Sequence, residues 1–168
     1  MTMTQEDKIL LFKDLGARLL YGVKCRVRYI VNNETTYGED VWFEEDDKIT
    51  RVNFDHMEVY TEWTLEYHDI ENIKLYLRPM ASMTEEELDE LRRRINKNCN
   101  TGRVITKDNF EKVNDWVWFC NMREWECVGS IMMGEVIDYL NEHMLDWRGL
   151  IPKGLAIAVT EENNPYKV

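Results

Sequence analysis

Hydrophobic and polar residues change their spacing along this chain, and each change predicts a different element. Near the N-terminus, apolar residues recur at the spacing of one helical face: Leu11, Phe12, Leu15 and Leu19. Thr4 precedes them and can cap the free amides of a first turn, so we expect a helix over residues 5–17. From Val23 the apolar residues alternate with polar ones, which is typical of a strand with one buried face.

The alternation continues in short runs that polar turns separate. The strands are expected at about 23–31, 36–44, 49–54, 57–67 and 73–77. Polar turns are expected at Asn32–Thr35, at Glu45–Lys48 and at Asp55–His56. Because strands this close in sequence usually pair with their neighbours, we expect an antiparallel β-meander over about 23–77.

The clearest local signal follows Pro79. Thr84 and Glu87 have the spacing of a capping box, in which each side chain bonds the other's backbone amide. Met83 and Leu88 flank this cap as a hydrophobic staple. The sequence therefore predicts a helix that begins after Thr84 and ends before a loop at 98–102.

The C-terminal half is less regular. Asp108 and Glu111 predict the start of another helix, and Ser130 predicts the start of a helix that ends near Asp146. Residues 115–128 fit a strand and a helix equally well by spacing, and we favour strands. The polar tail at 161–168 is expected to fray. We therefore expect one α+β domain over residues 1–168, in which the N-terminal helix and the C-terminal helices pack on the meander.

Charge narrows the range of partners. The net charge is −11, from 32 acidic and 21 basic residues, so we expect no direct binding to nucleic acid and no binding to membranes. The acidity can simply provide solubility, or it can attract a basic protein partner. In a third reading the chain mimics nucleic acid and occupies a basic groove. The N-terminus lacks a signal peptide and the chain lacks a long apolar run, so we expect a cytoplasmic protein.

Residues able to carry out catalysis are not arranged in a known motif. The three histidines, His56, His68 and His143, show no spacing of a metal site, and we expect no cofactor and no metal. The four cysteines, Cys25, Cys99, Cys120 and Cys127, form no CxxC pair and are expected to be packing residues. The sequence therefore favours a protein without enzymatic activity.

Aromatic and acidic residues supply the candidate contact sites. The chain has six tryptophans, and Trp is enriched at the centres of protein interfaces. Trp116, Trp118 and Trp125 lie in a stretch with apolar residues at both alternating sets of positions, so we expect one or two of them to be exposed. The acidic run Glu85–Glu87 is a second candidate contact, through Glu85, Glu86 and Glu87.

Three segments resemble an uncharacterised protein family. They are KDLGARLLYGVKCRV at 13–27, IENIKLYLRPMASMTEEELDEL at 70–91 and YLNEHMLDWRGLIPKGLAI at 139–157. Together they cover about one-third of the chain and are similar to a family of gut Bacteroidales and their prophages and mobile elements. The chain differs from the family pattern at Gly16 and Leu20. The resemblance implies an accessory factor that binds a host or phage protein, and it implies no activity and no site residues.

We therefore expect a non-enzymatic cytoplasmic protein that acts by protein–protein contact or self-association, with nucleic-acid mimicry as one version. The alternative is an enzyme or small-ligand-binding protein with an unrecognised site. A deep pocket that includes His56 or His68 would favour the alternative, and a flat surface with exposed Trp would favour protein contact.

Overall fold

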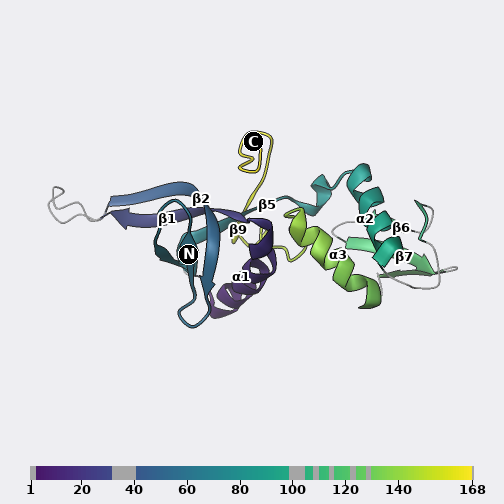
Figure 1. Cartoon of the computed structure of the whole chain (residues 1–168), viewed down its shortest axis with the longest axis horizontal. Coiled ribbons are helices and arrows are strands. Elements are labelled where there is room, and N and C mark those ends of the chain that lie inside the picture. Colours follow the sequence, from purple (N-terminus) through teal and green to yellow (C-terminus); the bar gives the residue numbers. More distant parts are fainter. Residues whose placement is uncertain are drawn as a thin grey trace. The chain divides into compact units, whose positions relative to one another are not determined.

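The chain divides into two compact units. The computed structural model describes residues 3–31, 41–98, 105–107, 110–113, 116–121, 124–127 and 130–167. The first unit contains residues 1–77 and 148–168, and the second contains residues 78–147 (Figure 1). The division into units does not show whether they fold together. The expectation that residues 1–168 form one domain therefore stays a prediction.

The first unit begins with helix α1 (Gln5–Arg18), within one residue of the predicted bounds. The Thr4 hydroxyl accepts a hydrogen bond from the Asp7 backbone N–H at 3.1 Å, as its capping position predicts. The predicted apolar face is buried at Leu11, Phe12 and Leu15. A short 3-10 turn, η1 (Leu19–Tyr21), follows and ends at Gly22, whose φ of 72° is the left-handed conformation that glycine adopts without strain.

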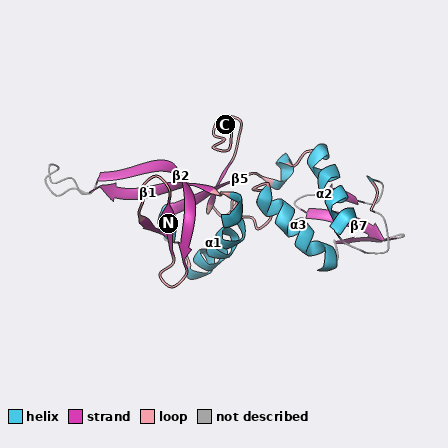
Figure 2. Ribbon diagram, viewed as in Figure 1, coloured by secondary structure: helices cyan, strands magenta, loops and turns pink. Residues whose placement is uncertain are grey.

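Strands form most of this unit (Figure 2). They pair into a six-stranded sheet in the order β4-β3-β2-β1-β5-β9. The strands are β1 (Lys24–Val31), β2 (Val41–Asn53), β3 (Glu58–Thr61), β4 (Tyr67–Asp69), β5 (Ile73–Leu77) and β9 (Ala156–Ala158). The first four pair antiparallel with their sequence neighbours, which confirms the meander. The chain then passes through the 3-10 turn η2 (Ile70–Asn72), and β5 returns to the other side of β1. Strand β9 joins β5 in parallel. The α+β class is confirmed.

Alternation along β1 gives the sheet two different faces. Val23, Cys25 and Val27 are completely buried and form the core with α1 and β5. Lys24, Arg26 and Arg28 point to the opposite side, which we call the outer face.

Two predictions within the meander are wrong. Glu45–Lys48 does not form a turn, because β2 runs without interruption through these residues. The predicted strand over 57–67 is divided, because β3 ends at Thr61 and β4 begins at Tyr67. Hydrogen bonds made by Asp46 and Asp47 explain why β2 is continuous and why the strand over 57–67 is divided. The turn expected at Asn32–Thr35 lies outside the described residues, whereas residues 54–57 do form the turn expected at Asp55–His56.

The second unit has two helices and a three-stranded sheet. Its elements are η3 (Met80–Ser82), α2 (Glu85–Asn98), β6 (Phe110–Val113), β7 (Trp116–Asn121), β8 (Glu124–Cys127) and α3 (Ser130–Glu142). The core of the unit lies between α2 and α3, and it includes Leu91, Ile95, Val136, Tyr139 and Leu140. The strands follow the order β6-β7-β8 and are antiparallel.

The helix predicted from Asp108 is wrong, because residues 110–113 form β6 instead. Pairing with β7, from Phe110 opposite Phe119 to Val113 opposite Trp116, outweighs the weak local helix signal. The strand interpretation of residues 115–128 is confirmed by β7 and β8. Helix α3 ends at Glu142, before the predicted Asp146. Met144 has a φ of 55°, and the Leu145 N–H bonds back to the Leu140 carbonyl at 2.9 Å.

The tail, for which we expect fraying, makes specific contacts at Tyr166. Its hydroxyl donates to the Tyr76 carbonyl oxygen at 3.0 Å and accepts from the Lys24 backbone N–H at 3.0 Å. Lys24 Nζ also donates to the Pro165 carbonyl at 2.5 Å. These bonds hold the tail next to β1 and β5 on the first unit.

A buried ion pair within α1 leads to the first prediction. Arg18 donates to Asp14 at 2.7 and 3.1 Å, and both side chains have 0% exposure. Substitution of Asp14→Ala leaves a buried guanidinium without its carboxylate, so we expect a loss of about 3 to 5 kcal/mol in the free energy of unfolding by urea titration. The control is Lys153→Ala, which removes a long, partly exposed pair with Asp7 and should cost less than about 1 kcal/mol. Equal losses in the two variants would contradict this account.

Candidate protein-binding surface on the first unit

Two strands extend beyond the rest of the sheet. Strand β5 pairs with β1 only at Cys25–Val27, and β3 pairs with β2 only from Ile49 to Asn53. Arg28–Val31 and Val41–Glu44 therefore pair only with each other among the described residues, and we call this ribbon the arm. Figure 1 shows β1 and β2 running out together past β5 and β9.

The arm carries aromatic side chains on both faces. On the outer face, Trp42 is 44% exposed, and the Arg28 guanidinium lies 4.1 Å from the centre of its ring. On the opposite face, Phe43 is 40% exposed and stacks on Tyr29 with ring centres 6.0 Å apart. Each face of the arm therefore presents one large aromatic ring to the surface.

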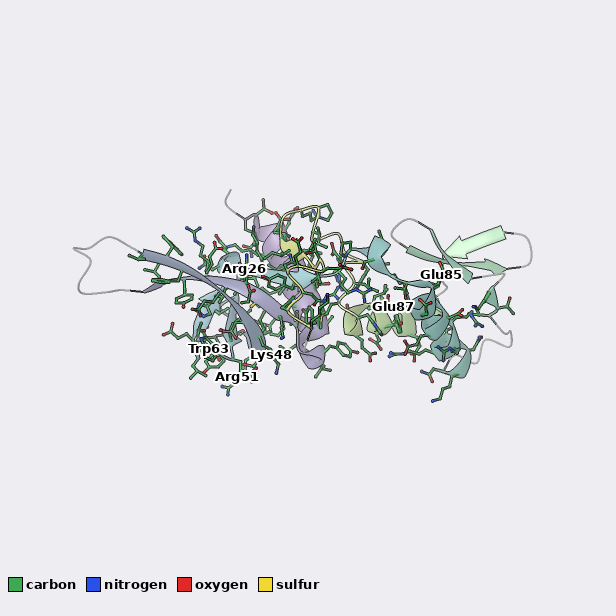
Figure 3. The ribbon with its side chains drawn as sticks, turned by 90° about the horizontal axis from the view of Figure 1, so that it is seen from above. Arg26, Lys48, Arg51, Trp63, Glu85 and Glu87 are labelled. Atoms are coloured by element: carbon green, nitrogen blue, oxygen red, sulfur yellow. The ribbon has the colours of Figure 1, made fainter. Side chains whose placement is uncertain are left out.

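Among the tryptophans whose side chains the structure describes, Trp42, Trp63 and Trp147, the most exposed lies beside the base of the arm. Trp63 is 78% exposed, and it belongs to the turn at residues 62–66 between β3 and β4. Figure 3 shows Trp63 near Lys48 and Arg51 along one side of the first unit. Trp42 and Phe43 lie on opposite faces of the arm, and Trp63 lies beside its base. We call these three exposed aromatic residues together the aromatic surface.

Asp47 organises the turn that presents Trp63. Its carboxylate accepts backbone hydrogen bonds from Lys48 at 2.6 Å, Trp63 at 2.9 Å and Thr64 at 3.1 Å. Thr61 and Thr64 close the turn with a side-chain hydrogen bond of 2.5 Å. Glu62 makes the last backbone hydrogen bond to β2, to the Lys48 carbonyl, and the next amide that would face β2 is that of Thr64. Because the Thr64 N–H binds the Asp47 side chain instead, the β2–β3 ladder ends at the pair of Ile49 and Thr61.

The acidic residues at the base of the arm are satisfied within the first unit. Asp46 accepts from Arg26 at 2.9 Å and from the Tyr76 hydroxyl at 2.7 Å. Burial raises the pKa of Asp46, but these two hydrogen bonds outweigh it and hold the pKa below its usual value. Burial also raises the pKa of Asp47, and its backbone hydrogen bonds lower the pKa by more. Both residues are therefore ionised structural groups, which explains why β2 passes through the expected turn.

A pocket of about 490 Å³ lies on the outer face, between these carboxylates and Trp63. Its lining consists of Lys24, Asp46, Asp47, Lys48, Glu62, Trp63 and Pro165. Most of these groups bind one another, and Lys48 pairs with Glu62 at 3.3 Å. Ligand pockets are usually lined mainly by apolar groups, so this lining is poorly suited to a small molecule.

The histidines lie outside that pocket. His68 is buried, accepts or donates a hydrogen bond with the Thr64 hydroxyl at 2.8 Å, and lies against the Tyr29 ring. Burial lowers its pKa, although the nearby carboxylates of Glu66 and Asp47 act in the opposite direction. His56 is exposed in a turn, and His143 stacks on Tyr139 in the second unit. Among the described residues, no group of three His, Cys, Asp or Glu residues is placed to hold a metal ion.

The three glutamates predicted as an acidic contact have different roles. Figure 3 labels Glu85 and Glu87 on the second unit. Glu85 and Glu86 are exposed, but Glu87 accepts from Arg78 at 2.6 and 2.9 Å and from the Thr84 backbone N–H at 2.8 Å. The Glu87 N–H in turn donates to the Thr84 hydroxyl at 3.2 Å, which confirms the capping box. Only Glu85 and Glu86 are therefore available to a partner.

The predicted tryptophans lie on the three-stranded sheet. Trp116 and Trp118 are two residues apart on β7, and Trp125 on β8 pairs with Cys120. By strand alternation this register places positions 116, 118 and 125 on one face of the sheet. Their exposure lies outside the described features, so their role in a contact stays a prediction. Of the cysteines, Cys25 is buried in the core, and burial raises the pKa of its thiol, as expected for a packing residue.

Sequence reasoning missed the residues of the aromatic surface. Trp42 and Phe43 are adjacent, so a strand must place one on each face, and neither face of the strand is then wholly polar. Trp63 falls within the predicted strand at 57–67, and the signal for its turn depends on Asp47, which is 16 residues away.

Comparisons with family models, curated proteins and solved structures found no match for this chain. The resemblance to a family of gut Bacteroidales and their mobile elements therefore stays a prediction. No helix among the described residues is long and apolar enough to cross a membrane.

Glu87 and Glu86 form a matched pair for a stability test. We expect Glu87→Ala to lower the free energy of unfolding by about 1.5 to 3 kcal/mol, because it removes a charge-assisted bond to Arg78 and half of the capping box. Glu86→Ala should change it by less than about 0.5 kcal/mol. Urea titration of both variants checks this, and similar values would show that Glu87 is not structural.

His68 should make stability depend on pH. Its folded pKa is below the unfolded value of 6.5, so the unfolded chain binds the proton first as the pH falls. The contribution of His68 is therefore complete above about pH 7 and is lost as the pH falls below 6.5. We expect the free energy of unfolding to fall more between pH 7.5 and 5.5 in the wild type than in His68→Gln. An identical fall in both proteins would be the contradictory result.

Proposed function

We propose that this chain is a non-enzymatic accessory protein that acts by binding another protein through the aromatic surface. The observation that carries the proposal is the exposure of Trp42, Phe43 and Trp63 on one unit. Large aromatic rings bury much area at little cost in conformational entropy, which is why they dominate the centres of interfaces. A cytoplasmic setting, and a partner from the host or a phage, belong to the same proposal.

The charges around the surface favour a protein over nucleic acid. The first unit contains 12 basic and 18 acidic residues, and the base of the arm holds Arg26 in a pair with Asp46. The excess of acidic residues in the first unit therefore disfavours binding to a phosphate backbone. Mimicry of nucleic acid remains one version of the proposal. The chain has acidic runs at 44–47 and 85–90. Mimicry would have to use Glu44, Glu45, Glu85 and Glu86, because the other carboxylates of these runs bind partners within the chain, as Asp46, Asp47, Glu87 and Asp89 do.

The pocket beside Trp63 supports a second candidate, a small-ligand-binding protein. Its volume of about 490 Å³ is within the range of ligand sites. The pairing of its charged groups makes it the weaker candidate, because a ligand would have to displace Lys48 from Glu62 or Lys24 from Pro165.

The test uses side-chain truncations that leave the backbone contacts intact. Trp63 binds Asp47 through its backbone N–H, so Trp63→Ala removes the ring and keeps the turn. We expect the tagged wild type to capture one stoichiometric protein from host lysate, and the double variant Trp42→Ala, Trp63→Ala to lose at least about tenfold of it. Nuclease treatment excludes capture through nucleic acid, and mass spectrometry identifies the bound protein.

The matched control is Leu20→Ala. Leu20 is 91% exposed in η1, so its truncation removes an exposed apolar side chain outside the aromatic surface. Capture should be unchanged in this variant. Equal capture by the double variant, or no captured protein with a folded bait, would contradict the proposal.

A further inference from the structure

We infer that the partner binds as an added strand, and that this strand is an extended segment rich in Lys or Arg that pairs with the free edge of β2. The inference rests on the proposed protein-binding function and specifies the chemistry of the partner. The edge consists of the backbone groups of Trp42, Glu44 and Asp46, and we call it the β2 edge.

Hydrogen bonds at the base of the arm fix which backbone groups face this edge. The Ile49 N–H donates to the Val23 carbonyl of β1 at 3.1 Å, and the Lys48 carbonyl accepts from the Glu62 N–H at 2.9 Å on the other side. Backbone groups of an antiparallel strand alternate between its two neighbours. Lys48 therefore faces away from β1. By the same alternation, the backbone N–H and C=O groups of Asp46, Glu44 and Trp42 also point away from β1.

No strand of the described chain occupies that side. Strand β3 ends at Thr61, opposite Ile49, and Asp47 then turns the chain away through Trp63 and Thr64. The β2 edge spans residues 42–46, or about 17 Å of strand, which matches a segment of five or six residues. Exposed strand edges readily accept another strand, and protein recognition often uses this mode.

Charge selects the occupant. Glu44 is exposed on the outer face, and Glu45 is half-buried on the other face. Opposite charges on facing strands stabilise a pair, so a Lys or Arg next to Glu44 is favoured. Apolar side chains of the same segment would cover Trp42 and Phe43. The net charge of −11 also attracts a basic segment before contact.

Other edges and other occupants fit less well. The edge of β1 in the arm offers only Arg28 and Ile30, and Arg28 repels a basic segment. A second copy of this chain, paired antiparallel through the β2 edge, would bring two sets of Glu44 and Glu45 together, and like charges on facing strands destabilise the pair.

The test uses an eight-residue peptide of alternating lysine and valine, and a counterpart with glutamate in place of lysine. In a low-salt nuclear magnetic resonance titration, we expect the lysine peptide to shift the amide signals of Trp42, Glu44 and Asp46. The glutamate peptide should cause no shift. Glu44→Pro removes one N–H from the β2 edge and none from the β1–β2 ladder, so it should abolish the shifts.

A second variant keeps the test decisive if the Glu44→Pro variant does not fold. The double variant Glu44→Lys, Glu45→Lys should weaken binding of the lysine peptide at least tenfold, and Glu85→Lys, Glu86→Lys, with the same charge change on the other unit, should weaken it far less. Equal weakening in both would show that binding follows net charge alone and would overturn the inference. So would shifts confined to other residues, no binding, or concentration-dependent dimerisation of the wild type that Glu44→Pro removes.

The protein captured from lysate separates the two proposals. If Trp42→Ala, Trp63→Ala loses the captured protein while folded Glu44→Pro keeps it, the protein-binding function stands and the added strand is wrong. If neither variant loses it, both proposals fail.

Discussion

The carboxylate of Asp47 is the constraint on which the first unit depends. It binds three backbone N–H groups, two of which belong to the turn after β3. These bonds end the ladder between β2 and β3, and they hold Trp63 at the surface. As a consequence β2 continues beyond its neighbour, and the arm is left with a free edge. One buried carboxylate therefore produces both the exposed tryptophan and the unpaired strand.

Charged side chains are used differently in the two units. In the first unit, Asp46 and Asp47 determine where strands continue and where they end. In the second, Glu87 joins a helix cap to Arg78, which precedes the helix. An acidic composition alone suggests a solvated surface, but these carboxylates have specific partners. The carboxylates that remain exposed, such as Glu44 and Glu86, are therefore the ones with a role to explain.

Signals contained within one element were readable from the sequence. The bounds of α1, the capping box of α2 and the full extent of β5 all follow from residues a few positions apart. Signals that depend on distant partners were not readable. The continuation of β2 needs Arg26 and Tyr76 to satisfy Asp46, and the strand β6 needs its register with β7. The aromatic surface was missed for the same reason, because the turn that exposes Trp63 is held by a residue of another strand.

Amide hydrogen exchange along β2 tests the central claim most directly. The account predicts an alternating pattern: the amides of Phe43 and Glu45, which face β1, exchange slowly, and those of Trp42, Glu44 and Asp46 exchange quickly. Slow exchange at all five amides would mean that the β2 edge is already covered within the free protein, and it would contradict the account.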